Sequence, residues 1–494
     1  MPTYLDEPGI GAVLIYLSIK YSSICKIIDL PERSHEGRKI RALEIAKGST
    51  TNKHGVLFIA GVHARELINP DLLLSFALKL CQAYTNNTGL VFGGKSYSST
   101  DVKLIVNNLD IFILPLVNPD GRVYVQAPGT SGDRWWRKNR NPNPGAPCMG
   151  VDINRNYDFL WSSGIGTSAN SCSEVFRGSV AFSEPETRNV RYLLDSFPNI
   201  KCMIDVHSYS ELILYPWGDD DNQSIDSSMN FKNPTYDGVR GIPGDGMYRE
   251  YIPQNNWDWY VRTGNRIRDA ISAVRGRHYT VQQSIGLYPT SGTSDDYAYG
   301  RYFVDTKKRK VFAFTIETAT EFQPPYAEAL NVISEVSSGL IEFCLASICV
   351  IEESVRGTRL FNELVDMRRF RDEELLSSKA GTKYVTILEE NTDEILRIIR
   401  DDKKLHSQTM KIIDDINKVI MSSSASEEKT KQRRTLIFSS NLVKDVEDML
   451  KSFKEKASPQ LRNAIEQSSI DLKYFSNKTL KEGLEAANKE HSKF

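Results

Sequence analysis

The sequence predicts an α/β fold with a mixed, twisted sheet flanked by helices, followed by a separate and mainly α-helical C-terminal region. Short apolar runs alternate with helical periodicity over about the first 345 residues, as in domains built around a largely parallel or mixed sheet. Every tryptophan, and every proline except Pro459, lies in that part. Beyond about residue 346 the charged fraction rises from about 21% to about 36%. We therefore expect two domains, at residues 1–346 and 347–494.

The predicted elements of the first part rest on apolar runs and on helical spacing. Short apolar runs that fit strands buried on both faces lie at 41–46, 55–61, 109–117, 201–206 and 311–316. Helices are predicted at 10–19, 70–84, 184–197 and 257–274. Two Gly-, Pro- and Asn-rich stretches, 126–150 and 218–256, are predicted to be long loops, which in a compact domain are often functional.

The C-terminal part has the spacing of amphipathic helices. Apolar residues recur three, four and seven positions apart among charged residues, which is typical of a stripe on one long helix, at 388, 395, 398, 405, 412, 416 and 419. Helical spacing resumes at 436–453 and 461–474. We expect a small bundle or coiled coil rather than a second catalytic domain. Its role stays open between oligomerisation, binding of a partner protein and covering the mouth of an active site.

Length, charge and cysteine content narrow the function classes. The chain has 494 residues, more than one ordinary hydrophobic core, and a net charge of −1 that gives no overall attraction to nucleic acid or anionic lipid. The apolar run at 10–19 is too short to span a bilayer and follows acidic residues, which favours a buried helix over an export signal. Seven scattered cysteines form no CxxC zinc pattern. We expect no nucleic-acid partner and no membrane span.

Two of the predicted buried strands end in side chains that bind zinc. The strand at 55–61 runs into Gly-Val-His63-Ala-Arg-Glu66, and the strand at 201–206 ends directly on His207. A catalytic zinc ion takes three protein ligands and keeps one position open, and these residues supply a His2Glu set. Because an HxxE pair alone arises often by chance, the prediction depends on the second strand end.

Six stretches, in one order along the chain, resemble the zinc carboxypeptidase family, the funnel-type metallocarboxypeptidases of the pancreatic A and B kind. They are GVHARE, RWWRKNR, CMGVDINRNYDF, DVHSYSELILYPWG, LYPTSGTSDDYAYG and FAFTIET. The resemblance covers about residues 4–345, or about 70% of the chain, and nothing after residue 350 takes part. It implies one zinc ion per chain and hydrolysis of the C-terminal bond of peptides or proteins by zinc-activated water.

The resemblance also implies roles for individual residues. It makes His63, Glu66 and His207 the zinc ligands, with Asp152 behind His63 to orient it. It makes Glu317 the general base and Arg137 the residue that stabilises the oxyanion. The matched substrate-binding residues are the carboxylate clamp of Asn154 and Arg155, the outer-subsite residues Arg65 and Tyr209, and the mobile Tyr288. Without the resemblance, Asp152 is interpreted as a capping or turn residue, and RWWRKNR as a solvated basic loop or a nucleic-acid contact.

Specificity depends on Asp295. Seven positions after Tyr288 the family places the base of its side-chain pocket, and a carboxylate there implies a preference for C-terminal Lys or Arg, as in B-type enzymes. After Glu317, however, the chain has Thr-Ala-Thr instead of the Leu-Arg-Asp of the animal digestive enzymes, a feature of the bacterial carboxypeptidase T-like branch. The alternatives are a carboxypeptidase of broad specificity and a catalytically decayed binding module with an interaction tail.

Two further expectations concern compartment and calcium. Cys148 and Cys172 match a family disulfide, which implies maturation in an oxidising compartment. The chain begins almost at the family's mature N-terminus, so we expect a secreted enzyme if a leader is missing and a cytoplasmic one if the start is complete. The acidic run at 219–221 is open between a calcium site and a solvated loop.

Overall fold

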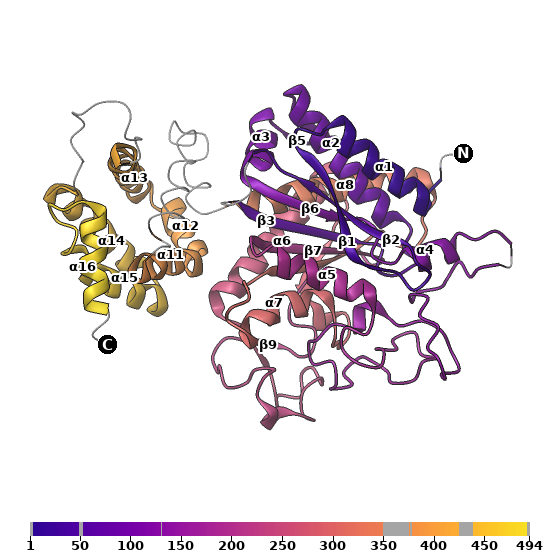
Figure 1. Cartoon of the computed structure of the whole chain (residues 1–494). Coiled ribbons are helices and arrows are strands. Elements are labelled where there is room, and N and C mark those ends of the chain that lie inside the picture. The colour runs from indigo at the N-terminus through magenta and orange to yellow at the C-terminus, as the bar shows by residue number, and fades with distance from the viewer. Residues whose placement is uncertain are drawn as a thin grey trace. The chain divides into compact units, whose positions relative to one another are not determined.

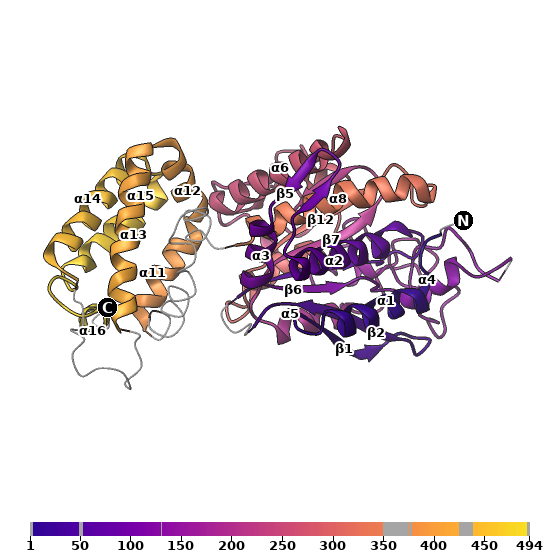
Figure 2. The same ribbon diagram turned by 90° about the horizontal axis from the view of Figure 1, so that it is seen from above.

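The computed structural model describes residues 3–48, 53–129, 131–348, 375, 378–423 and 438–491. The chain divides into two units, Met1–Ile348 and Cys349–Phe494. The first is a sheet with helices packed against it and the second is built of helices (Figures 1 and 2). The predicted fold class, including the helical C-terminal region, is therefore confirmed.

The first unit is organised around an eight-stranded sheet in the order β1-β2-β6-β3-β7-β12-β8-β11. The strands are β1 (Cys25–Arg33), β2 (Lys39–Ile45), β3 (His54–Ala60), β6 (Leu109–Leu114), β7 (Ile200–Ser208), β8 (Leu212–Tyr215), β11 (Thr280–Gln283) and β12 (Phe312–Thr318). Strand β3 runs parallel to β6 and β7, and β7 runs parallel to β12, while β2 pairs with β1 and β6 in the antiparallel sense. The carboxyl ends of the three central strands β3, β7 and β12 therefore meet at one edge of the sheet.

Helices cover both faces of this sheet. One face carries α1 (Glu7–Lys20), α2 (Ile68–Asn86) and α8 (Tyr326–Ala346), and the other carries α5 (Pro185–Ser196) and α7 (Ser294–Val304), as Figure 1 shows. Helix α6 (Gln254–Arg275) packs on α8. The smaller elements are α3 (Ser99–Asn108), α4 (Pro119–Val125), β4 (Leu90–Phe92), β5 (Lys95–Tyr97), β9 (Asn222–Gln223) and β10 (Glu250–Tyr251). Among the described helices, only α8 is long and apolar enough to cross a membrane, and 72% of its most apolar window is buried, as in a core helix.

The second unit consists of shorter helices than the sequence predicts. They are α11 (Lys379–Glu390), α12 (Thr392–Asp401), α13 (Lys403–Ser423), α14 (Ser440–Lys456), α15 (Pro459–Leu472) and α16 (Leu480–His491). The prediction of one long helix is wrong, because the chain breaks at Asn391 and again at Asp402, whose carboxylate accepts a hydrogen bond from Leu405 N and so caps α13. Ile398 and Phe453 share one hydrophobic cluster of this unit. Residues 436 and 437 of the predicted helix at 436–453 lie outside the described residues.

Candidate active site

Three side chains meet where β3 and β7 end. His63 and Glu66 follow β3, and His207 lies in the last residues of the neighbouring parallel strand β7. His63 Nδ1 lies 2.7 Å from Glu66 Oε1, and His207 Nδ1 lies 3.1 Å from His63 Nδ1 and 3.2 Å from Glu66 Oε2. All three side chains are buried. The structure thus brings together the three residues that the sequence singles out as zinc ligands.

Each of the two imidazoles has a carboxylate at its other nitrogen. His63 Nε2 lies 3.1 Å from Asp152 Oδ1, and His207 Nε2 lies 3.0 Å from Asp205 Oδ2. Asp205 in turn accepts a hydrogen bond from Ser294 Oγ over 2.6 Å. Carboxylates in this position fix the imidazole tautomer and turn the remaining nitrogen toward a metal. Asp205 is not among the residues predicted from the sequence, although strand alternation places it on the same face as His207, two residues later.

Electrostatics favour the charged forms of these groups. Burial lowers the pKa of His207, but Asp205 and Glu66 more than offset this and hold that pKa well above its ordinary value. Burial opposes ionisation of Glu66, yet the two histidines hold the pKa of its carboxyl below the usual range. The pKa of Asp152 is likewise held low, against the effect of burial, by Arg137 and His63.

The arrangement fits a divalent cation. The Nδ1 atoms of His63 and His207 and the carboxylate of Glu66 lie within hydrogen-bond distance of one another. A proton on one of the two nitrogens leaves the other nitrogen and the carboxylate with lone pairs that face each other. A cation accepts a lone pair from each of them. Two imidazole nitrogens and one carboxylate are a normal ligand set for catalytic zinc.

Glu317 and Arg137 flank this set. In the parallel pairing of β12 with β7, Glu317 lies opposite His207, so both side chains leave the same face of the sheet. Burial raises the pKa of Glu317 to about 8, with His207 opposing the shift and Glu66 adding to it. Arg137 donates from Nε and Nη2 to Asp152 Oδ2 over 3.0 and 2.9 Å. One carboxylate therefore holds both Arg137 and His63.

The predicted carboxylate clamp lies in a short 3-10 helix, Ile153–Arg155, that begins directly after Asp152. Asn154 Oδ1 accepts a hydrogen bond from Ser294 N over 2.9 Å, which leaves the amide nitrogen as its free donor end among the described contacts. Arg155 donates from Nε to Gly166 O over 3.0 Å, and its guanidinium carbon lies 5.8 Å from the centre of the Tyr288 ring. The Tyr288 side chain is exposed.

The predicted outer-subsite residues share one aromatic neighbour. The guanidinium carbon of Arg65 lies 4.3 Å from the centre of the Phe322 ring, and the Tyr209 ring meets Phe322 edge-on at 4.8 Å between centres. Phe322 lies just after β12 and was not predicted. Only its contacts distinguish it from other aromatic residues in loops.

Asp295 lies in the first turn of α7 and is buried. Its Oδ2 accepts hydrogen bonds from Ser284 Oγ over 3.3 Å and from Thr315 Oγ1 over 3.2 Å, and its Oδ1 accepts one from Asp296 N over 3.0 Å. Burial raises the pKa of Asp295. Among the described residues, no Lys or Arg side chain is paired with it.

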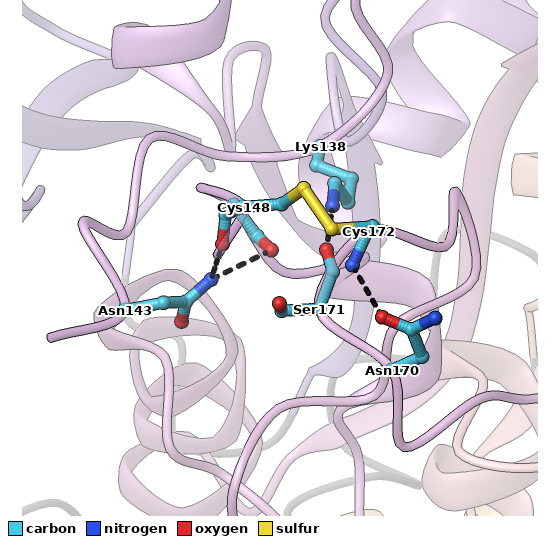
Figure 3. The surroundings of a disulfide bond; sticks show 7 residues. Lys138, Asn143, Cys148, Asn170, Ser171 and Cys172 are labelled. Carbon is cyan, nitrogen blue, oxygen red and sulfur yellow. Dashed lines mark hydrogen bonds between the residues drawn. A yellow bond between two sulfur atoms is a disulfide. The ribbon is translucent and has the colours of Figure 1, made fainter. Parts of the chain in front are cut away.

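Two loop predictions have structural outcomes. Cys148 and Cys172 are joined by a disulfide, beside which Lys138 Nζ donates to Ser171 O and Asn143 Nδ2 donates to Cys148 O (Figure 3). In the acidic run at 219–221, the first two aspartates are fully buried, so a solvated loop is the wrong description of them.

Comparisons with known proteins give the chain's family. The family model described as zinc carboxypeptidase matches residues 10–337. Carboxypeptidase B of Astacus astacus is 31% identical over 319 residues, which cover 64% of this chain and 86% of that protein. Carboxypeptidase O of Bos taurus is 29% identical over 316 residues, which cover 63% of this chain and 72% of that protein. The crystal structure of the carboxypeptidase A from Helicoverpa armigera matches with a TM-score of 0.55 and 25% identity, covering 70% of this chain and 73% of that chain.

These matches confirm the family, the enzyme class and the zinc cofactor that the sequence predicts. The chain belongs to the zinc carboxypeptidase family and is a zinc-dependent metallocarboxypeptidase that acts on peptides.

Proposed function

We propose that this metallocarboxypeptidase removes C-terminal residues with a preference for Lys and Arg. The observation that carries the proposal is the state of Asp295, a buried carboxylate whose hydrogen-bond partners among the described residues are neutral hydroxyl and amide groups. A buried charge without a counter-charge is costly, and burial raises its pKa for that reason. The ammonium or guanidinium group of a substrate side chain would supply the missing positive charge.

The zinc ion is assigned to His63 Nδ1, Glu66 and His207 Nδ1, because these atoms converge while both Nε2 atoms rest against carboxylates. When bound, zinc supplies a Lewis acid that polarises the scissile carbonyl and activates water. Asp152 and Asp205 keep the two imidazoles in the orientation that presents Nδ1.

Glu317 is assigned the proton transfers, from water to the leaving amine. It lies next to His207 at the end of a central strand, where its carboxylate can take a proton from water and pass it to the leaving amine. Arg137 is fixed by its two hydrogen bonds to Asp152 and supplies a positive charge to the developing oxyanion.

Substrate recognition is assigned to the residues around this centre. Asn154 and Arg155 bind the terminal carboxylate, for which a guanidinium and an amide are suitable donors. Tyr288 closes over the bound end, and Arg65 and Tyr209 line the outer subsites against Phe322.

Residues 1–346 are proposed to form the catalytic domain and residues 347–494 a separate region that mediates oligomerisation or partner binding. The apolar clusters in the helices of the second unit support independent folding. Deletion of residues after 350 should lower the solution mass beyond the loss of one tail if the region oligomerises the chain, and should leave peptide hydrolysis intact.

The proposal is tested with peptides that differ only in the last residue, Lys, Leu or Glu. We expect Lys to be removed fastest. Equal rates for Lys and Leu would refute the role of Asp295 without affecting the zinc assignment. A Glu317→Gln variant should keep its zinc and lose turnover, and wild-type turnover in that variant would overturn the proposed base.

A further inference from the structure

A second group of metal-ligand side chains lies in the catalytic unit, apart from the zinc ligands. One nitrogen or oxygen atom from each of His35, Glu184 and Glu186 lies within 4.8 Å of the other two. Among the described residues, only this group and the His63, Glu66 and His207 group have this arrangement. His35 lies between β1 and β2, and the two glutamates lie at the start of α5, so distant segments of the chain meet at this point.

Glu184 is held in place by neutral donors. Its side chain is fully buried, and its carboxylate accepts hydrogen bonds from Ser183 Oγ over 2.6 Å, Asn139 Nδ2 over 2.7 Å and Asn141 Nδ2 over 2.9 and 3.0 Å. His35 Nε2 lies 2.8 Å from Glu184 Oε2. Carboxylates that bind metals are commonly oriented by hydrogen bonds of this kind.

Glu186 has a buried carboxylate oxygen atom without a hydrogen-bond partner among the described residues. Its side chain is fully buried; Oε2 accepts one hydrogen bond, from Asn139 Nδ2 over 3.1 Å, while Oε1 has no hydrogen-bond partner among the described residues. Burial, with the neighbouring Glu184, raises the pKa of Glu186 to about 7. An unpartnered carboxylate oxygen in the interior is costly unless a proton or a cation neutralises it.

The third member gives the group access to solvent. The His35 side chain is 24% exposed, so an ion can enter from this side and water can complete its coordination. One imidazole nitrogen with two carboxylates suits a transition metal such as Zn²⁺ or Mn²⁺, whereas Ca²⁺ and Mg²⁺ prefer oxygen ligands alone. We propose that His35, Glu184 and Glu186 bind a second divalent transition-metal ion.

The proposed ion stabilises the loop that carries Arg137. Asn139, which donates to both glutamates, also accepts a hydrogen bond from Val151 N over 2.8 Å, directly before Asp152. The ion therefore has a structural role: it acts on the substrate-binding residues only through Asn139 and the backbone next to Asp152.

The test is the zinc content of the folded, zinc-loaded enzyme after equilibrium dialysis against Zn²⁺. We expect the wild type to hold a second zinc ion per chain, and the His35→Asn and Glu186→Gln variants to hold only the first. A His278→Asn variant, which removes an exposed histidine outside both groups, should still hold two. One zinc ion in the wild type, or two in all the variants, would overturn the proposal.

Thermal unfolding provides a second readout that does not depend on peptide hydrolysis. Added Mn²⁺ should raise the Tm of wild-type enzyme that holds one zinc ion per chain by about 5 °C at saturating concentration, and should not raise that of the His35→Asn variant. Because His35 is partly exposed, its replacement should not prevent folding, and retention of the first zinc ion verifies this. An equal rise in both proteins would refute the site even if the proposed peptidase specificity were correct.

Discussion

Replacement of Asp295 by Asn removes one charge from the proposed specificity pocket and keeps the size of the side chain. The Ser284 and Thr315 hydroxyl groups can still donate to the amide oxygen, whereas the hydrogen bond from Asp296 N to the other carboxylate oxygen is lost. We expect kcat/KM for a C-terminal Lys to fall strongly while kcat/KM for a C-terminal Leu stays the same or rises.

The size of the effect follows from the burial of Asp295. A substrate ammonium about 4 Å from the carboxylate gains about 4 kcal/mol at an effective dielectric constant of about 20. Desolvation of the ammonium and the carboxylate offsets part of this electrostatic energy, so that the net interaction is about 3 kcal/mol. Its loss in the variant corresponds to about a 100-fold decrease in kcat/KM for Lys.

Asp296 provides the matched control. It is also buried, but its carboxylate accepts hydrogen bonds from Gly218 N and Thr293 Oγ1 and so holds the local backbone. We expect Asp296→Asn to lower stability and to leave the ratio of Lys to Leu rates unchanged. A Lys-to-Leu ratio that is unchanged in Asp295→Asn, or that changes equally in both variants, contradicts the assignment of the pocket.

Three further predictions concern zinc, Arg137 and a buried acid away from the site. Removal of zinc with a chelator should abolish hydrolysis and lower Tm, with both restored by added zinc; an unchanged Tm would argue against the buried ligand set. Arg137→Lys should lower kcat by about 100-fold at unchanged zinc content, because an ammonium cannot form the paired hydrogen bonds to Asp152. Burial raises the pKa of Asp110 to about 7, so the folded protein retains a proton that the unfolded chain loses from about pH 4. Stability therefore falls as pH rises between these values, and Asp110→Asn, which has no such proton, should gain up to about 4 kcal/mol over the wild type by pH 8. Urea unfolding at several pH values measures this difference, and parallel profiles for the two proteins would contradict it.

The central sheet and its catalytic edge could be predicted from the sequence because burial leaves a strong pattern. Strands β3, β7 and β12 are covered by helices on both faces and appear as continuous apolar runs, and the polar residues that end them are conspicuous. The edge strands give no such pattern. Strand β1 contains Pro31 and alternates irregularly, and β11 is Thr-Val-Gln-Gln, because an edge strand needs neither full burial nor every backbone donor.

Groups that act through contacts rather than motifs could not be predicted. Asp205 contacts His207 only because the strand brings them to one face, and Phe322 acquires its neighbours from two separate loops. In the second unit, apolar spacing continues through Asn391 and Asp402, so the pattern alone gives no sign that the helix ends there. The hydrogen bond that caps α13 is a local contact that periodicity does not encode.

The stretch RWWRKNR illustrates how one motif divides its residues between chemistry and support. The solvated-loop and nucleic-acid interpretations of its second half are wrong, because Arg137, Lys138 and Asn139 are all buried. Lys138 Nζ donates to Ser171 O beside the disulfide, and Asn139 donates to both Glu184 and Glu186. Arg137 instead donates to Asp152, the carboxylate that also contacts His63. A loop that keeps one guanidinium at a fixed place is therefore anchored by the two residues that follow it.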